Sequence, residues 1–257
     1  MRSLQARQTE DSPKQPMKVD DTNERLCVHC LVDLPKNEVT KDHVFPSSWY
    51  TDDTPPEVQR WTVPSCKACN GKFGVLEKEL FIRLALCIDP RKAEASGITK
   101  KLLRTLGVGP DMPEKEREIR EKLRLEVLAA TKPYTGDETL PTLPGLGLHQ
   151  GFSPESQRAV PIRADCLDAV LEKVFRGCEY VLNNRQYVKL PRSIGIYHVH
   201  QEPSQVAQTF SKFATRTSLG PGFEIKRAAT QDGEYAVLYK AIIWGTLVSY
   251  ASIDMYF

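Results

Sequence analysis

The sequence predicts an α+β fold, and three observations carry that prediction. Residues 26–72 contain two CxxC pairs and little helical periodicity. Residues 74–130 place apolar side chains at spacings near three and four, which is typical of amphipathic helices. Beyond residue 154, one helical stretch is followed mostly by segments that favour strands. Helices and strands in separate runs are expected to fold as α+β.

Composition sets the outer limits of the function. A chain of 257 residues can hold one large or two modest domains, and 40% hydrophobic residues suffice for a packed core. The formal net charge of +2 does not by itself indicate a nucleic-acid binder, so any basic surface must be local. No stretch approaches the roughly 18 apolar residues of a membrane span, which predicts no membrane partner.

Cysteine usage indicates the compartment. Four of the seven cysteines form the CxxC pairs, and the odd total argues against a disulfide framework. Metal-bound thiolates in a reducing compartment are favoured, so we expect a cytoplasmic protein. Cys87, Cys166 and Cys178 lie in apolar-periodic stretches and are expected to be ordinary buried cysteines.

The elements are expected in the following order along the chain. A knuckle at residues 27–30 precedes a short hairpin at 39–45, a loop at 46–64 and a second knuckle that runs into a helix at 74–87. Asp89-Pro90 ends that helix. The remaining elements are helices at 100–106, 113–130, 163–182 and 204–214, and strands at 193–200, 223–228 and 235–252.

Composition shifts along the chain divide it into five segments. Residues 132–154 are rich in Pro, Gly and Thr and are expected to form a linker, the clearest domain boundary in the sequence. The segments are a disordered tail at 1–25, a cysteine-bearing module at 26–90, a helical extension at 91–131, the linker, and a C-terminal α+β domain at 155–257.

The two CxxC pairs predict a structural zinc site. Each pair supplies two thiolates along one edge of a tetrahedron, and four thiolates leave no open position for substrate. Residues 31–65 separate the pairs, a longer gap than the ~15–20 residues of a simple zinc ribbon. A structure is therefore inserted between the knuckles. The predicted ligands are Cys27, Cys30, Cys66 and Cys69.

The combined motif resembles the zinc-knuckle branch of the HNH endonucleases. It consists of Cys27-Val28-His29-Cys30, then Asp42-His43-Val44-Phe45-Pro46, then Cys66-Lys67-Ala68-Cys69-Asn70 with Lys72-Phe73-Gly74. The resemblance covers about residues 26–86, so the segment 26–90 is expected to be a nuclease module. It implies the ββα-metal fold, in which a hairpin, a loop and a helix surround a catalytic divalent ion.

The resemblance also implies roles for three residues. His43 takes the place of the general base that activates water, and imidazole suits that task because its ordinary pKa lies near working pH. Asp42 and Asn70 take the places of the ligands to the catalytic ion, magnesium or manganese, which would neutralise charge on the phosphate. The implied reaction is hydrolysis of DNA phosphodiester bonds.

One position departs from the family pattern. The family places an Asn shortly before the second knuckle, where it orients the base histidine through a backbone contact. Trp61 stands there in this chain, and its side chain is unsuited to the task. Gln59 or Thr62 could substitute, depending on the loop.

The departure keeps a second hypothesis open, a non-catalytic zinc-binding module that acts as a nucleic-acid or protein adaptor. A third hypothesis is an RNA-directed enzyme. Outside the motif, His198 and His200 would face the same side of a strand and could form a second metal site, although a partly exposed strand face is the favoured explanation. Three aromatic residues could stack on nucleic-acid bases, although an apolar strand segment favours a place in the core: Tyr239, Trp244 and Tyr250. Five basic residues could line a phosphate track, and ordinary solubility explains them equally: Arg91, Lys92, Lys100, Lys101 and Arg104.

Overall fold

The computed structural model describes residues 25–134, 143, 146–147, 149, 151–188, 194–229 and 235–255. Residues 1–24 of the predicted tail and residues 135–142 of the predicted linker lie outside these ranges. Helices and sheets are both present, which confirms the α+β class.

The C-terminal part is built on a five-stranded antiparallel sheet with the order β5-β9-β8-β7-β6. The predicted strand at 235–252 is in fact two strands, because Trp244 and Gly245 adopt positive φ and turn the chain back. The sequence also gave no indication of β6. The strands are β5 (Ile194–Tyr197), β6 (Thr215–Ser218), β7 (Phe223–Ala229), β8 (Tyr235–Ile243) and β9 (Leu247–Met255).

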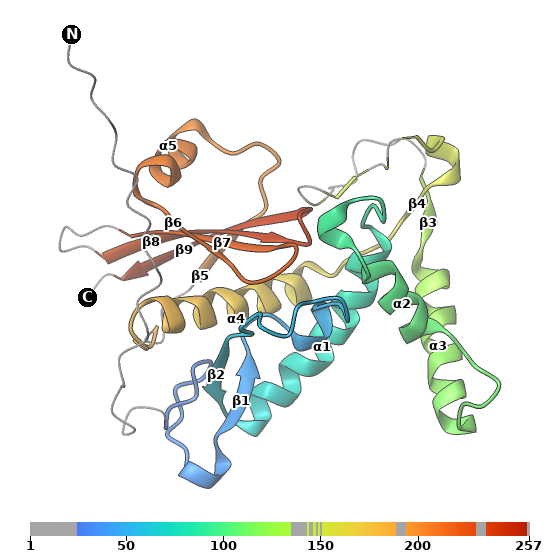
Figure 1. Cartoon of the computed structure of the whole chain (residues 1–257), viewed down its shortest axis with the longest axis horizontal. Helices are drawn as coiled ribbons and strands as arrows, with labels where there is room; N and C mark the ends of the chain where they lie inside the picture. The colour runs from blue at the N-terminus through green and yellow to red at the C-terminus, as the bar shows by residue number, and fades with distance from the viewer. Residues whose placement is uncertain are drawn as a thin grey trace.

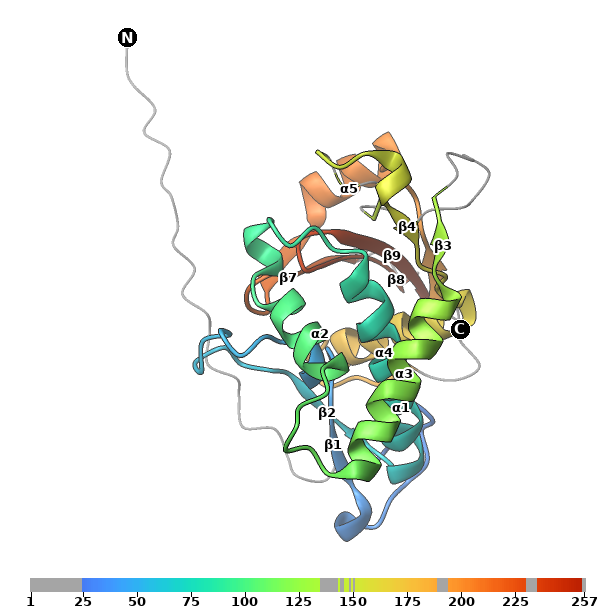
Figure 2. The ribbon, with the colours of Figure 1, turned by 90° about the vertical axis from the view of Figure 1, so that its right-hand side faces the viewer.

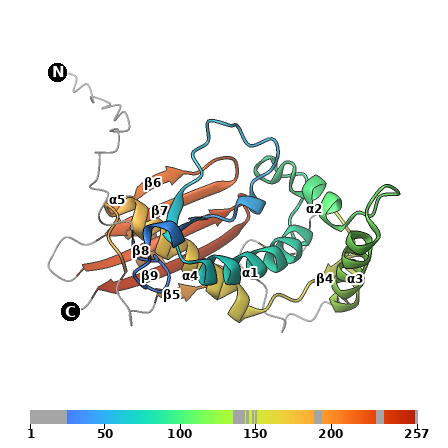
Figure 3. The same ribbon diagram turned by 90° about the horizontal axis from the view of Figure 1, so that it is seen from below.

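Helices cover both faces of this sheet (Figure 1). α4 (Ala164–Leu182) crosses one face and α5 (Ser204–Phe213) lies on the other. Every second residue of β8 from Val237 to Ile243 is fully buried, and Tyr239 among them contacts Phe175 of α4. This period of two is what a strand with one face on the core requires. Seen from below, α4 and α1 lie in front of the strands (Figure 3).

The N-terminal part forms a hairpin and a helix, but not the hairpin that the sequence predicts. β1 (Thr40–His43) pairs antiparallel with β2 (Thr62–Ser65), which begins inside the predicted loop 46–64 and ends one residue beyond it. The prediction of a local hairpin at 39–45 is therefore wrong. The helix that follows, α1 (Lys67–Leu86), begins at the second knuckle, seven residues before the predicted start at 74.

The remaining elements extend from α1. α2 (Ile98–Leu106) and α3 (Glu114–Ala130) pack in sequence beside it, α3 farthest from the sheet (Figure 2). β3 (Lys132–Pro133) and β4 (Arg158–Ala159) form a small separate pair. Among the described helices, none is both long and apolar enough to cross a membrane. Short 3-10 turns occur at Lys36–Glu38, Ser47–Trp49, Ala93–Ala95 and Pro154–Ser156.

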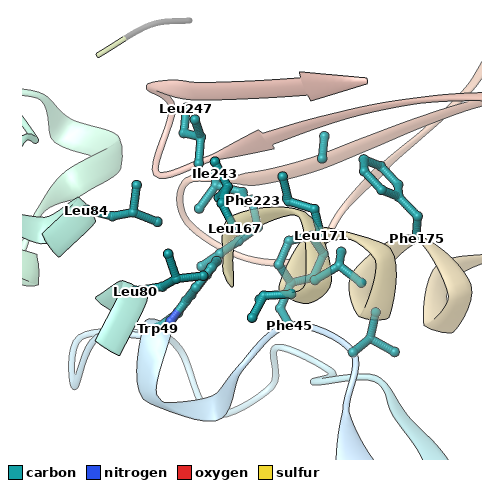
Figure 4. Packing of buried hydrophobic residues seen from close by; sticks show 14 of the residues in the cluster. Phe45, Trp49, Leu80, Leu84, Leu167, Leu171, Phe175, Phe223, Ile243 and Leu247 are labelled. Atoms are coloured by element: carbon teal, nitrogen blue, oxygen red, sulfur yellow. The ribbon is translucent and has the colours of Figure 1, made fainter. Parts of the chain in front are cut away.

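One hydrophobic core is shared by residues of both predicted domains (Figure 4). Trp49, from the long loop between β1 and β2, is fully buried, and its indole ring lies 5.4 Å from that of Trp244. The Trp244 Nε1–H donates to the carbonyl oxygen of Trp49 at 2.9 Å. The segment predicted as a loop at 46–64 thus contributes Trp49 to the core between the hairpin and the sheet. The domain boundaries themselves stay a prediction.

A glycine at this junction gives a first testable prediction. Gly222 has φ +79°, and a Cβ there would collide with the carbonyl oxygen of Glu94 and lie 2.9 Å from the Cα of Trp244. Gly222→Ala is therefore expected to lower the free energy of unfolding by more than about 1 kcal/mol. Gly74→Ala is the matched control, because its Cβ meets nothing within 4 Å in α1. That change is expected to add about 0.5–1 kcal/mol. Urea denaturation of both variants measures the contrast, and equal effects would contradict it.

Candidate metal centre and histidine site

The four cysteines of the CxxC pairs form one cluster. Their sulfur atoms all lie within 4.8 Å of one another, and the Sγ atoms of Cys30 and Cys66 are 3.8 Å apart. A zinc ion bound to four thiolates at about 2.3 Å places the sulfurs roughly 3.8 Å apart. The cluster fits a tetrahedral metal ion such as zinc. Elsewhere in the described residues, no group of three or more His, Cys, Asp or Glu side chains is arranged to hold an ion.

The electrostatics of the cluster favour a bound cation. Burial raises the pKa of Cys30 and Cys69, and neighbouring sulfurs raise that of Cys69 further. Burial also opposes ionisation of Cys27, but hydrogen bonds from backbone N–H groups outweigh it and lower the pKa of that thiol to about 7. One thiolate is thus favoured while its neighbours resist a second negative charge. A divalent cation removes this repulsion, because thiols that bind a metal lose their protons.

Three segments of backbone meet at the cluster. The N–H of Leu31, which has φ 58°, donates to the carbonyl of Cys27 at 2.8 Å and closes the first knuckle. The N–H of Val28 donates to the carbonyl of Pro64 at 2.9 Å and ties this knuckle to β2. Cys66 caps α1, since its Sγ accepts the N–H of Cys69 at 3.3 Å. The cluster therefore fixes the knuckle, the hairpin and the helix to one another.

Asp42 is a buried residue of β1. Only 5% of the residue is exposed. Its Oδ2 lies 2.9 Å from Nε2 of His29, and its Oδ1 lies 3.0 Å from Nζ of Lys173 on α4. Burial opposes ionisation of this carboxyl, but the hydrogen bond with His29 and the charge of Lys173 outweigh it and lower its pKa. Both carboxylate oxygens already have cationic or hydrogen-bonding partners.

His43 is partly exposed at the end of β1. Its backbone carbonyl accepts a hydrogen bond from Nζ of Lys173 at 2.7 Å. Burial lowers the pKa of its ring, the charges of Lys173 and Arg60 lower it further, and the charge of Asp42 acts in the opposite direction. The ring is thus neutral at neutral pH, and no hydrogen bond within the described residues occupies its nitrogens. A neutral, accessible imidazole can accept a proton.

Asn70 lies in the first turn of α1 and faces the hairpin. Its Nδ2 donates to Oγ1 of Thr40 at 3.2 Å and to the carbonyl of Lys41 at 3.5 Å. None of the hydrogen bonds in the described residues joins its side chain to Asp42 or His43. Asp42 and His43 lie in β1, and Asn70 lies in the adjacent first turn of α1. Each of the three predicted catalytic residues contacts a different set of partners.

These contacts decide whether a second ion fits. Mg²⁺ keeps several waters and needs open, near-octahedral positions on a carboxylate. Asp42 is nearly inaccessible, and the ammonium of Lys173 holds the place where a cation would neutralise it. As the residues are arranged, Asp42 and Asn70 do not fit a hydrated divalent ion. Their roles as ligands stay predictions, and no reaction step is derived through them.

Comparisons with protein families, curated proteins and solved structures find no match to this chain. The case for a function therefore stands on the residues and their geometry.

Sequence reasoning missed the partners of Asp42. Glu77 of α1 forms an ion pair with Lys173, and burial raises its pKa against the opposing charge of that lysine. Lys173 contacts both Asp42 and Glu77, and His29 contacts the other carboxylate oxygen of Asp42. Lys173 lies 96 residues beyond Glu77 in the sequence. The sequence signal for Lys173 is a charged residue within the apolar stripe of a predicted helix, next to Val174. A buried charge is rare unless it is paired, so such a residue indicates a distant partner.

Most of the other candidates have structural partners in the described residues, whereas His200, Lys92 and Lys100 are exposed. Nε2 of His198 lies 2.9 Å from Asp168, and Nδ1 lies 3.4 Å from Oγ of Ser249. Ser249 is fully buried, so this Ser-His-Asp arrangement offers no nucleophile to a substrate. The three aromatic candidates are all at most 8% exposed and belong to the cores. Among the basic residues, Arg91 pairs with Asp89, Arg104 pairs with Asp52, and Lys101 donates to the carbonyl of Tyr50.

Proposed function

We propose that this chain is an HNH-type endonuclease that hydrolyses phosphodiester bonds of DNA, with a structural zinc ion at the four cysteines. The observation that carries the proposal is the state of His43: a partly exposed imidazole with free ring nitrogens and a lowered pKa. It stands at the end of a hairpin that the cysteine cluster ties to the helix behind it. This agrees with the base role that the sequence motif implies.

The proposed step begins with proton transfer to His43. The ring accepts a proton from water as the water oxygen bonds to phosphorus. The bond from phosphorus to the leaving ester oxygen then breaks, and that oxygen takes a proton from solvent. Arg60 is an exposed cation near enough for its charge to act on His43, and it can attract the phosphate. General-base catalysis of this kind contributes about 10²–10⁴-fold.

The divalent ion that the family uses, magnesium or manganese, remains part of the proposal. Because Lys173 and His29 close Asp42, we assign no residue of the described part to that ion. The assay therefore supplies each ion separately and also omits both. Strict dependence of cleavage on one of them would require Asp42 to leave Lys173.

The test is nicking of supercoiled plasmid DNA. His43→Ala is expected to lower the rate at least about 100-fold, with one zinc ion per chain in both proteins. His198→Ala is the matched control, since it removes another partly exposed imidazole that already has a structural partner. Equal nicking by the wild type and His43→Ala would sink the mechanism. A parallel assay with RNA distinguishes an RNA-directed enzyme.

A second candidate is the zinc-binding adaptor without catalysis. The closed state of Asp42 favours it, because a carboxylate used only for structure is expected to be buried and paired. This candidate predicts salt-sensitive DNA binding with no cleavage under any divalent ion. Binding that His43→Ala leaves intact, together with no nicking by the wild type, would select it.

A further inference from the structure

Lys173 is the most completely enclosed charge beside the candidate site. Its side chain is 0% exposed, although it lies in the middle of α4, 130 residues beyond His43. The ammonium contacts three oxygens from two other elements: Oδ1 of Asp42 at 3.0 Å, the carbonyl of His43 at 2.7 Å, and Oε1 of Glu77. An ammonium has three donors, so these acceptors fill its hydrogen-bonding capacity.

The contact to the His43 carbonyl acts on the direction of the ring. The ring nitrogens have no hydrogen-bond partner among the described residues, so the backbone determines where the imidazole points. On the hairpin side, Trp61 contributes only its carbonyl, which accepts the N–H of Val44 at 2.9 Å. Neither Gln59 nor Thr62 donates a side-chain hydrogen bond to His43 in the described structure. The one side chain that holds the His43 peptide unit is Lys173.

We infer that Lys173 is a positioning residue for His43, and that α4 thereby supplies part of the site that the motif places at residues 26–90. The inference rests on the proposed function of His43. Because Lys173 is fully enclosed, it does not reach a substrate and acts only through the hairpin. Its pair with Asp42, the direct neighbour of His43, keeps the ammonium at the His43 carbonyl even without Glu77, because a buried charge is retained when it is paired.

The position of α4 makes this role consistent with the packing. Gly177, one turn after Lys173, lies so close to β1 that an added Cβ would be 3.0 Å from Cγ2 of Val44. Val44 directly follows His43 and is fully buried. The helix therefore contacts this part of the chain at two points, the His43 carbonyl through a hydrogen bond and Val44 through van der Waals packing.

The test compares two variants that differ only at residue 173. Lys173→Met combined with Glu77→Leu removes the ammonium together with one of its carboxylates, and Met retains most of the aliphatic stem. Glu77→Leu alone is the control, because Lys173 keeps its bonds to Asp42 and His43. We expect the double variant to lose about 100-fold in kcat, as a misplaced reacting group does, with KM unchanged. The control is expected to retain kcat within about threefold, since it leaves the His43 contact intact.

A conservative variant at residue 173 separates the effect of the hydrogen bond to the His43 carbonyl from that of side-chain packing. Lys173→Arg retains a donor for the carbonyl and is expected to keep kcat within about tenfold of the wild type. It also decides the question if the double variant does not fold. An equal fall of kcat in the double variant and in Glu77→Leu would overturn the inference, as would a 100-fold loss in Lys173→Arg. Zinc content and circular dichroism show that each variant is folded.

A second measurement needs no cleavage. In protein labelled with ¹³C-histidine, the ring Cε1–Hε1 signal of His43 is identified by its loss in His43→Ala. We expect this signal to shift and broaden in the double variant, while that of His198 stays unchanged. If the wild type cleaves no nucleic acid but the His43 signal responds, the proposed function fails and the positioning role stands. If the wild type cleaves and neither kcat nor the signal responds, the positioning role fails alone.

Discussion

Cys69→Ser is expected to abolish zinc binding and to destabilise the chain more than any other single change considered above. The four sulfurs lie within 4.8 Å of one another, and three of them do not complete a tetrahedral site. Structural zinc contributes roughly 10–16 kcal/mol in zinc-finger peptides. Here the cluster joins the first knuckle, β2 and the start of α1, so its loss releases all three.

The shared hydrophobic core limits how much of the chain unfolds in Cys69→Ser. Val44, Phe45 and Trp49 pack against α4 and the sheet, so the C-terminal part is expected to stay folded. A loss of even about 5 kcal/mol lowers Tm by more than about 10 °C, because each kcal/mol shifts Tm by roughly 2–4 °C at this size. Elemental analysis and thermal melting followed by circular dichroism measure both effects.

Cys87→Ser is the matched control for this experiment. Cys87 lies just after α1, outside the cluster, and its Sγ donates a hydrogen bond to the carbonyl of Arg83 at 3.3 Å. It is expected to keep one zinc ion per chain and nearly the wild-type Tm. A Cys69→Ser protein with full zinc content and an unchanged Tm would show that the cysteine cluster holds no structural ion.

Arg227→Met is expected to cost about 3–5 kcal/mol, the cost of leaving a buried charge without its partner. The partner is Glu179 of α4, which is fully buried. Nε and Nη2 of Arg227 each lie 2.9 Å from one of its carboxylate oxygens, and the Tyr239 hydroxyl donates to the same group. Loss of the guanidinium removes this cation from the buried carboxylate, and the neutral hydroxyl of Tyr239 does not balance the negative charge. Urea denaturation at pH 7 measures the change in the free energy of unfolding.

A double variant identifies the cause. Glu179→Leu combined with Arg227→Met removes both charges, and replacing a whole buried pair with apolar residues is often neutral or stabilising by about 1–4 kcal/mol. The double variant is therefore expected to recover most of the stability that Arg227→Met loses. If both proteins are equally unstable, packing rather than an uncompensated charge is responsible. Lys240→Met is a control, since Lys240 pairs with the partly exposed Glu202 elsewhere in the sheet.

The helices were predictable because their signals are local. α2, α3, α4 and α5 lie within two residues of the ranges that apolar spacing predicts. The strand pairing of the hairpin was not, because β1 and β2 are separated by a loop of residues 44–61 whose apolar side chains resemble no regular element. Trp49 lies in the core through contacts with distant residues, among them Trp244, nearly two hundred residues away. Such contacts depend on tertiary packing, which local spacing does not encode.

The sequence by itself singled out the four cysteines that form one cluster, because two CxxC pairs supply the four thiolates that fit a tetrahedral metal ion such as zinc. It also singled out Asp42, His43 and Asn70, by motif alone. Only the tertiary structure decided what each of them contacts. The sequence of a strand does not reveal which distant element packs against it. The contacts of Lys173 with Asp42 and with the His43 carbonyl exist only because α4 lies against β1. We propose that the orienting contact, which the side chain of Trp61 is unsuited to make, comes instead from Lys173 of α4.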